Sequence, residues 1–354
     1  MALRSGSRAR AAPPSYRVLP ALEGVLLVAF AVAPLLLPDY LATFASRLLI
    51  LGMLAISFDL VFGYAGIMSF GQALFFGAGG YGVALLGRDL GVSSAFAALP
   101  AALLIGLTLG WLVSAFLLLG RHPPSVIFVA LGTLTASFAA EELARSWYYL
   151  GGQNGIPSIP MLTAGGHELG DTQFYYLVLG LFVLVYVGCR ALTRSQFGLA
   201  LAGIREQEAR IGFFGYRVEV FKTITFSAAG AVAGLAGGLY AFHEGFVWPS
   251  ILGVVLSTQI VLYCLFGGTG TLVGAILGVI AIEGLSYALS ERFPTIWPVL
   301  LGVLLVLVIL FLPRGVVSLF VSERERVGDF GRRSRAKATA APELVSPEGE
   351  HVPP

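Results

Sequence analysis

Charged residues are scarce in this chain of 354 amino acids, and their scarcity limits what the protein can be. Asp, Glu, Lys and Arg make up 12% of the residues, whereas soluble domains average about 25%. Hydrophobic residues make up 57%, and the mean hydropathy is +0.85. A disordered chain is excluded because disorder requires low hydrophobicity. The composition indicates an integral membrane protein. The net charge of +2, without a basic patch interleaved with aromatics, predicts no nucleic-acid partner.

Cysteine and histidine are also rare, which argues against disulfide-rich and metal-binding proteins. The two cysteines, Cys189 and Cys264, lie in apolar runs and are expected to be small buried fillers. The four histidines are scattered and predict no metal site: His122, His167, His243 and His351.

Nucleotide-binding and hydrolase motifs are absent from the sequence. The phosphate-binding pattern G-x-x-x-x-G-K-[ST] does not occur, since Lys222 and Thr223 follow Phe221 instead of a glycine. H-E-x-x-H and G-x-S-x-G are absent as well. We therefore expect no ATP hydrolysis and no cofactor bound by this chain itself.

Long apolar runs and 45 glycines are what the chain has instead. They predict an all-α, polytopic transmembrane bundle, in which small residues let helices approach closely. About ten spans are expected, at 18–38, 41–62, 67–87, 94–119, 124–147, 172–192, 221–242, 251–266, 270–289 and 295–312. The third is interrupted by glycine and the eighth is short. Such segments are tolerated only against protein or a water-filled cavity, so these two are expected to break or line a path.

The distribution of Lys and Arg predicts the orientation. With a cytoplasmic N-terminus, eighteen of the 22 basic residues fall inside, and Arg47, Arg88, Arg145 and Arg292 fall outside or near the outer interface. Both termini are then cytoplasmic. The predicted parts are a tail at 1–17, a transmembrane domain at 18–320 and a disordered tail at 321–354. The first apolar run is longer than the core of a signal peptide, so we expect a retained span.

A charged segment at 194–220 interrupts the apolar sequence on the predicted cytoplasmic side. Phe197, Leu201, Ile204 and Ile211 share one face of a helix with a 3.6-residue period. Glu206 and Arg210 are spaced for an ion pair, and Gly212 and Gly215 are expected to end the helix. Two interpretations remain: a helix lying in the lipid headgroups, or one that docks against another protein.

The segment "SQFGLALAGIREQEARIGFFGY" resembles the cytoplasmic coupling segment of branched-chain amino acid-type ABC importer permeases. That pattern is approximately S-x-F-G-x-x-L-x-A-I-R-x-x-E-x-x-A-x-x-x-G. It is matched by Ser195, Phe197, Gly198, Ile204, Arg205, Glu208 and Gly215, with Gly203 in place of the usual Ala. "GYAGIMSFGQALFFGAGGY", "GGQNGIP" and "FGGTGTLVGAILG" resemble further motifs of the same family. The resemblance covers roughly residues 20 to 320 and is greatest to the larger, M-type subunit.

The resemblance implies a subunit of an ATP-driven importer in the bacterial inner membrane. A second permease subunit would share the translocation path, two cytoplasmic ABC ATPases would use the ATP, and a periplasmic binding protein would deliver the substrate. Branched-chain or related amino acids are the expected substrates, with urea or short amides as the alternative. The residues expected to couple to the ATPases are Phe197, Gly198, Leu201, Ile204, Arg205, Glu206, Glu208, Gly212 and Gly215.

Polar residues within the predicted spans are candidates for the path. They are Ser69, Gln72, Thr133, Thr135 and Ser137, each of which has hydrogen bonding between helices as its other interpretation. An ion-coupled secondary transporter is a remoter alternative. It would need intramembrane acids, for which Asp59, Glu141, Glu142 and Glu283 are the candidates.

Overall fold

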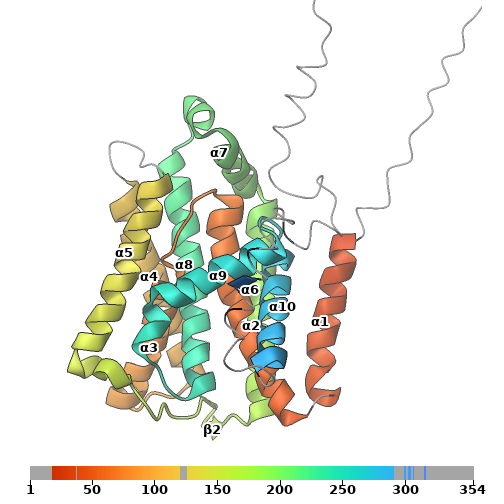
Figure 1. The fold of residues 1–354 in the computed structure, drawn as a ribbon, viewed down its shortest axis with the longest axis vertical. Coiled ribbons are helices and arrows are strands. Elements are labelled where there is room, and N and C mark those ends of the chain that lie inside the picture. Colours follow the sequence, from red (N-terminus) through yellow and green to blue (C-terminus); the bar gives the residue numbers. More distant parts are fainter. Residues whose placement is uncertain are drawn as a thin grey trace, which may run out of the picture.

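The computed structural model describes residues 18–36, 38–119 and 126–290, together with residues 299, 302, 303, 306 and 315. Helices dominate this part of the chain, as the sequence predicts (Figure 1). In chain order the elements are α1 (Val18–Leu36), α2 (Asp39–Asp59), the π-helix η2 (Leu60–Tyr64), α3 (Gln72–Leu90), α4 (Ala95–Leu118), α5 (Val126–Ser146), the short 3₁₀ turns η3 (Tyr148–Leu150) and η4 (Gly152–Asn154), β1 (Thr163–Ala164), β2 (His167–Glu168), α6 (Asp171–Arg194), α7 (Gln196–Phe213), α8 (Val218–Glu244), the 3₁₀ turn η5 (Pro249–Leu252), α9 (Val254–Gly267) and α10 (Val273–Ser290).

Six helical stretches in the described part are long and apolar enough to cross a membrane: α2 with η2, α4, α5, α6, α8 and α10. The predicted count of about ten spans is therefore not confirmed. The predicted span 295–312 lies mostly outside the described residues. The tails predicted at 1–17 and 321–354 lie wholly outside them.

Both segments that the sequence marks as interrupted are broken in the structure. Residues 65–71, between η2 and α3, are not helical. Gly253 is extended, with φ −88° and ψ 175°, and it separates η5 from α9. The 14 residues of α9 extend about 21 Å at 1.5 Å per residue, which is less than the ~30 Å hydrocarbon core.

Helix α8 forms the centre of the bundle and packs closely against α3 and α4 because the contacts are made by glycines. A Cβ atom added to Gly79 of α3 would lie 2.1 Å from the carbonyl oxygen of Gly234 on α8. One added to Gly106 of α4 would lie 2.1 Å from the carbonyl oxygen of Gly230. Any side chain at these positions would push the helices apart, so the glycines at these contacts are explained by helix packing.

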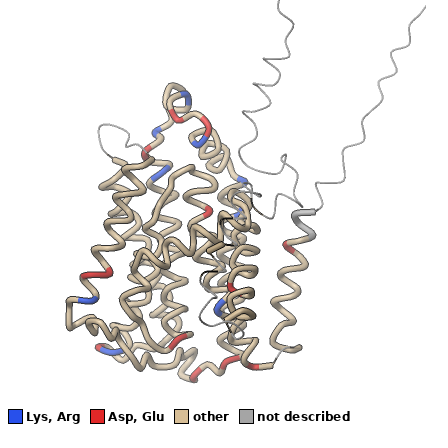
Figure 2. The backbone as a smooth tube through the Cα atoms, in the orientation of Figure 1, with Lys and Arg blue, Asp and Glu red and all other residues tan. Residues whose placement is uncertain are grey.

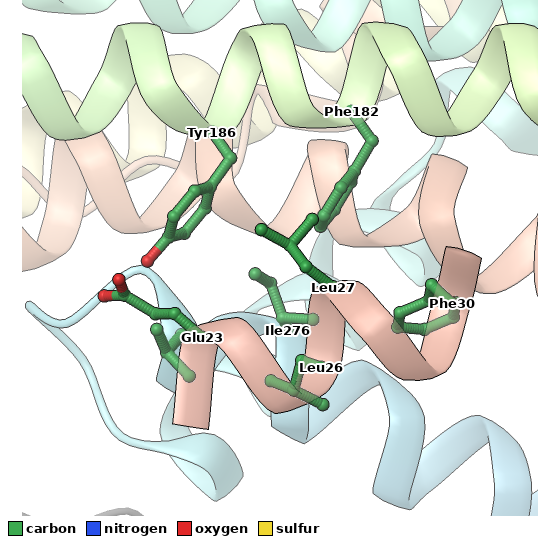
Figure 3. A pocket seen from close by; sticks show the side chains of 8 residues that line it. Glu23, Leu26, Leu27, Phe30, Phe182, Tyr186 and Ile276 are labelled. Atoms are coloured by element: carbon green, nitrogen blue, oxygen red, sulfur yellow. The ribbon is translucent and has the colours of Figure 1, made fainter. Parts of the chain in front are cut away.

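Helix α1 lies at the edge of the bundle, where it packs against α2 and α6 and makes polar contacts to α6 (Figure 1). The Tyr175 hydroxyl donates to the Phe30 carbonyl at 2.6 Å. Further along α6, Arg190 forms an ion pair with Glu23 and donates to the Tyr186 hydroxyl at 3.0 Å. Figure 3 shows the Glu23 carboxylate directed toward Tyr186 beside a small apolar gap. Since Glu23 precedes Phe30 while Arg190 follows Tyr175, α1 and α6 run antiparallel, which places the start of α1 near the α7 end of α6.

The two ends of the bundle differ in structure. Helix α7 projects from one end, and the β1–β2 hairpin lies at the other (Figure 1). Charged residues gather at both ends and are sparse between them (Figure 2).

The predicted outside loop at 148–171 is tied to the chain after α8, since Ile156 and Val247 exchange backbone hydrogen bonds of 2.9 and 3.0 Å. The Asp89 carboxylate accepts a 2.5 Å hydrogen bond from Tyr149 in the same loop, which raises the pKa of that phenol.

Candidate coupling and translocation sites

The segment predicted to dock forms α7 (Gln196–Phe213), which has a kink, and its apolar face packs against the bundle. Leu201 and Ile204 are buried, and the ring of Phe197 stacks on that of Phe221 with centroids 4.9 Å apart. A Cβ at Gly198 would meet the Thr193 carbonyl oxygen at 2.0 Å, so only glycine permits the tight passage from α6 into α7. These contacts fix one face of α7 to its own chain and leave the other face exposed.

The second half of α7 differs from the prediction, because the helix is broken at Gln207, with φ −151° and ψ 82°. The break removes the i,i+4 geometry, so the expected ion pair between Glu206 and Arg210 does not form between these two described residues. Gly212 lies inside the last turn and does not end it. The left-handed turn is made by Gly215, with φ +87°. A break at glutamine has no sequence signal, since glutamine favours helix.

Two of the charged residues expected on the docking surface have partners within the chain. The guanidinium of Arg205 donates to the carbonyl of Gly63 in η2, although Arg205 is an exposed residue. Glu208 pairs with Lys222 of α8 at 2.6 Å. Glu206 is exposed beside them. Arg205 and Glu208 therefore fasten α7 to the bundle, and Glu206 is the acidic residue of this group that faces outward.

Gly63 lies beside the buried carboxylate of Asp59. Asp59, at the end of α2, accepts backbone hydrogen bonds from Gly270 at 2.6 Å and Leu272 at 2.9 Å. A Cβ at Gly63 would lie 2.2 Å from Asp59 Oδ1 and 2.6 Å from the Gly270 nitrogen. Asp59, a candidate for ion coupling from the sequence, thus holds the α9–α10 connection. The similar stretches "FGYAG" and "FGGTG" meet at this point, which links α7, η2 and the α9–α10 connection.

Four of the five predicted path residues lie at the two broken segments. The Thr133 hydroxyl accepts from the backbone nitrogen of Phe70 at 3.0 Å, and the Ser69 hydroxyl accepts from Gly71 at 3.1 Å. Ser137 donates to the carbonyl of Leu252 in η5 at 2.6 Å. These hydroxyls satisfy backbone groups that the broken segments leave open.

Gln72 is the fourth of these residues and the one with unused hydrogen-bonding capacity. Its carbonyl accepts from Ser57 at 3.2 Å, whereas its buried amide nitrogen has no hydrogen-bond partner. Thr135 is separate from the group, because it lies on the exposed side of α5 and bonds to the carbonyl of Leu131 in its own helix. The helical period of the sequence indicates this separation. Thr133 and Ser137 are four residues apart and share a face of the helix, whereas Thr135 lies between them on another face.

The described residues contain no group of three or more His, Cys, Asp or Glu that could hold a metal ion. What they do contain is a bundle of apolar helices with two broken segments, polar side chains at the breaks and a helix projecting from one end. These features define a multi-pass membrane protein with the architecture of a permease.

The particular family follows from comparison with known proteins. Residues 40–309 match the family model described as the permease component of the branched-chain amino acid transport system, and the chain belongs to that family. The match begins at α2, so α1 lies outside it.

Similar proteins carry related names. The chain is 28% identical over 336 residues to the high-affinity branched-chain amino acid transport system permease protein LivM of Escherichia coli, covering 85% of this chain and 78% of that protein. It is 24% identical to the probable LivM of Methanocaldococcus jannaschii, over 75% and 89% of the two chains. It is 30% identical to the autoinducer 2 import system permease protein LsrC of an Enterobacter strain, over 58% and 62%. No solved structure matches the chain.

Proposed function

We propose that this chain is a membrane subunit of an ATP-driven importer for branched-chain or related amino acids. The observation that carries the proposal is the family match over residues 40–309, together with LivM relatives that are aligned over most of both chains. The relatives reported above are not named for urea, so amino acids are the proposed substrates. The LsrC relative, which aligns over 58% of this chain, makes autoinducer 2 the substrate to test beside them.

The proposed assembly contains a second permease subunit, two cytoplasmic ABC ATPases and a periplasmic binding protein. Helix α7 supports this assembly, because it presents an exposed, charged face beyond the apolar bundle that is available to contact the ATPases. In this proposal α7 carries movement of the ATPases into the bundle, and both chain termini lie on the same, cytoplasmic side. Mixed charge on such a surface provides register and specificity more than affinity.

The experiment begins with the full-length chain, tagged and purified with its associated subunits from the membranes of its own host. Mass spectrometry should identify an ABC ATPase and a second permease subunit. The assembly, reconstituted with ATP inside the vesicles and the binding protein outside, should accumulate leucine, isoleucine or valine. Accumulation of urea or autoinducer 2, with no uptake of these amino acids, would contradict the proposed substrate and leave the importer class intact.

A further inference from the structure

A cavity of about 160 Å³ opens beside the second broken segment, between α2, α3, α8, η5 and α9. Its polar lining consists of Arg47, Tyr240, Trp248, Ser250, Gln259 and Tyr263, and the remaining wall is aliphatic or aromatic. Trp248 and Ser250 follow Val247, which the 148–171 loop holds by backbone hydrogen bonds. Hence one wall is a non-helical segment, which is tolerated inside a bundle where it faces protein or lines a cavity.

Arg47 lies eight residues into α2, so its charge is within a span, where ionisable side chains are costly and usually functional. Its Nη1 is 3.8 Å from Glu244 and its Nε is 3.8 Å from Glu283. Both distances exceed the 2.7–2.9 Å of a charge-assisted hydrogen bond, and the buried Nε has no hydrogen-bond partner. The guanidinium is therefore electrostatically balanced without a charge-assisted hydrogen bond to either carboxylate, and 40% of the side chain is exposed.

The two carboxylates near Arg47 differ in how they are engaged. Glu283 of α10 accepts from the Gln259 amide at 2.9 Å and from the Tyr263 hydroxyl, and only 7% of its side chain is exposed. Glu244, at the end of α8, has 22% of its side chain exposed. Glu283 is thus fixed in the wall behind Arg47, whereas Glu244, which lies near Arg47 and Tyr240, is the more exposed of the two carboxylates.

Aromatic and aliphatic groups complete the cavity. The rings of Tyr240 and Trp248 are 6.0 Å apart, and aromatic faces attract ammonium groups. Leu51 and Leu256 add aliphatic surface. The volume is below the ~300–1,000 Å³ typical of sites for drug-sized ligands, so the occupant is a small molecule. The cavity therefore combines a guanidinium, a nearby carboxylate, aromatic faces and an apolar wall.

We propose that this cavity binds an aliphatic amino acid during transport, an inference that rests on the proposed function and adds a site to it. The α-carboxylate lies against Arg47, the α-ammonium lies near Glu244 and the aromatic rings, and the side chain contacts the aliphatic wall. Since Glu244 and Glu283 already offset the charge of Arg47, binding is weak enough to permit release. Urea offers neither charge to Arg47 nor an apolar part to the wall.

A purely structural role for Arg47, bracing α2 against α8 and α10, would also make its substitution harmful. The decisive experiment therefore measures whether an amino acid occupies the cavity. Ser250→Cys introduces a thiol into the cavity lining, and the native Cys189 and Cys264 are buried. The matched control is Thr258→Cys, an exposed position of α9 that does not line the cavity. Both variants are made in the full-length chain and purified with its associated subunits, and reaction with a small thiol reagent is timed.

Leucine at about four times its dissociation constant should slow modification of Ser250→Cys about fivefold, since the free fraction is 1/(1 + [L]/Kd). Leucinol, which lacks the carboxylate, and urea should not slow it, and Thr258→Cys should be unaffected. Adding Arg47→Gln should abolish the protection while leaving the unprotected rate similar.

Three results would overturn the site. The first is the absence of protection in an assembly that imports leucine, which leaves the proposed function standing. The second is protection by leucine that persists in Arg47→Gln. The third is a Ser250→Cys thiol that reacts in no state of the ATP cycle, because a transport site must open to water. Protection by urea but not by leucine would contradict the proposed substrate class as well.

Discussion

Gly63 is a residue at which the bundle tolerates little change. Its Cα lies between the carboxylate of Asp59 and the backbone of Gly270, and Arg205 of α7 donates to its carbonyl. The two groups that a new Cβ would meet are both held by the Asp59–Gly270 hydrogen bond. Neither can move without breaking that contact.

We therefore predict that Gly63→Ala lowers the apparent melting temperature of the detergent-purified assembly. Overpacking of this kind costs about 1–3 kcal/mol or more. Gly180→Ala in α6 is the control, since a Cβ there meets nothing within 4 Å and alanine favours helix by about 1 kcal/mol. An unchanged melting temperature for Gly63→Ala would show that the close approach is relieved at little cost.

The sequence carries a signal for Arg47. An arginine inside a predicted span is a candidate for a functional site by its cost alone, yet the charge count placed it at the outer interface. Its partners Glu244 and Glu283 follow it by roughly 200 residues in the chain. A hydropathy pattern identifies spans without identifying which spans are neighbours, so the cavity could not be predicted.

At the scale of the element, α7 has two kinds of charged residue. Glu208 pairs with Lys222, whose side chain is 12% exposed, while Glu206 faces outward. Reversing both Arg205 and Glu208 would break two internal contacts, so that change does not test docking alone. The helix and its apolar face were predictable from the 3.6-residue period. The break at Gln207 and the inward contacts of Arg205 and Glu208 were not, because they depend on tertiary neighbours.

We predict that Glu208→Lys lowers the melting temperature of the assembly and that Glu208→Lys with Lys222→Glu restores most of it. The Glu208 side chain is 44% exposed, so the contribution of the pair is about 0.2–1 kcal/mol. The single change places like charges together. Failure of the double exchange to restore stability would show that the loss comes from a different contact of Glu208.

Glu206→Lys makes the same charge change on the exposed face of α7 and should leave the melting temperature unchanged. If α7 docks on the ATPases, this variant should weaken their retention during purification or separate ATP hydrolysis from uptake. Wild-type values for subunit retention, hydrolysis and uptake together would favour a helix that lies in the headgroup layer.

At the scale of the whole molecule, the account depends on which ends of the bundle face the cytoplasm and the outside. The 148–171 loop and α7 lie at opposite ends (Figure 1), and the excess of basic residues predicts that α7 is inside. Composition was sufficient for the class, and the orientation stays a prediction from the charges. Composition and charge did not give the number of spans, since α9 is shorter than the hydrocarbon core.

An impermeant thiol reagent should modify Asn154→Cys only from the outer side of the membrane and Gly212→Cys only from the inner side. Both positions are exposed, and a Cβ at Gly212 meets nothing within 4 Å. Reaction of Asn154→Cys solely from the cytoplasmic side would invert the orientation and remove the coupling role of α7.

The most direct test of the central claim is the driving force for uptake. The full-length chain is reconstituted alone and, in parallel, with its associated subunits and binding protein, and leucine uptake is measured with internal ATP or with a sodium or proton gradient. The account predicts uptake by the assembly with ATP, and none by the lone chain under any gradient. Gradient-driven uptake by the lone chain would contradict it and establish an ion-coupled secondary transporter instead.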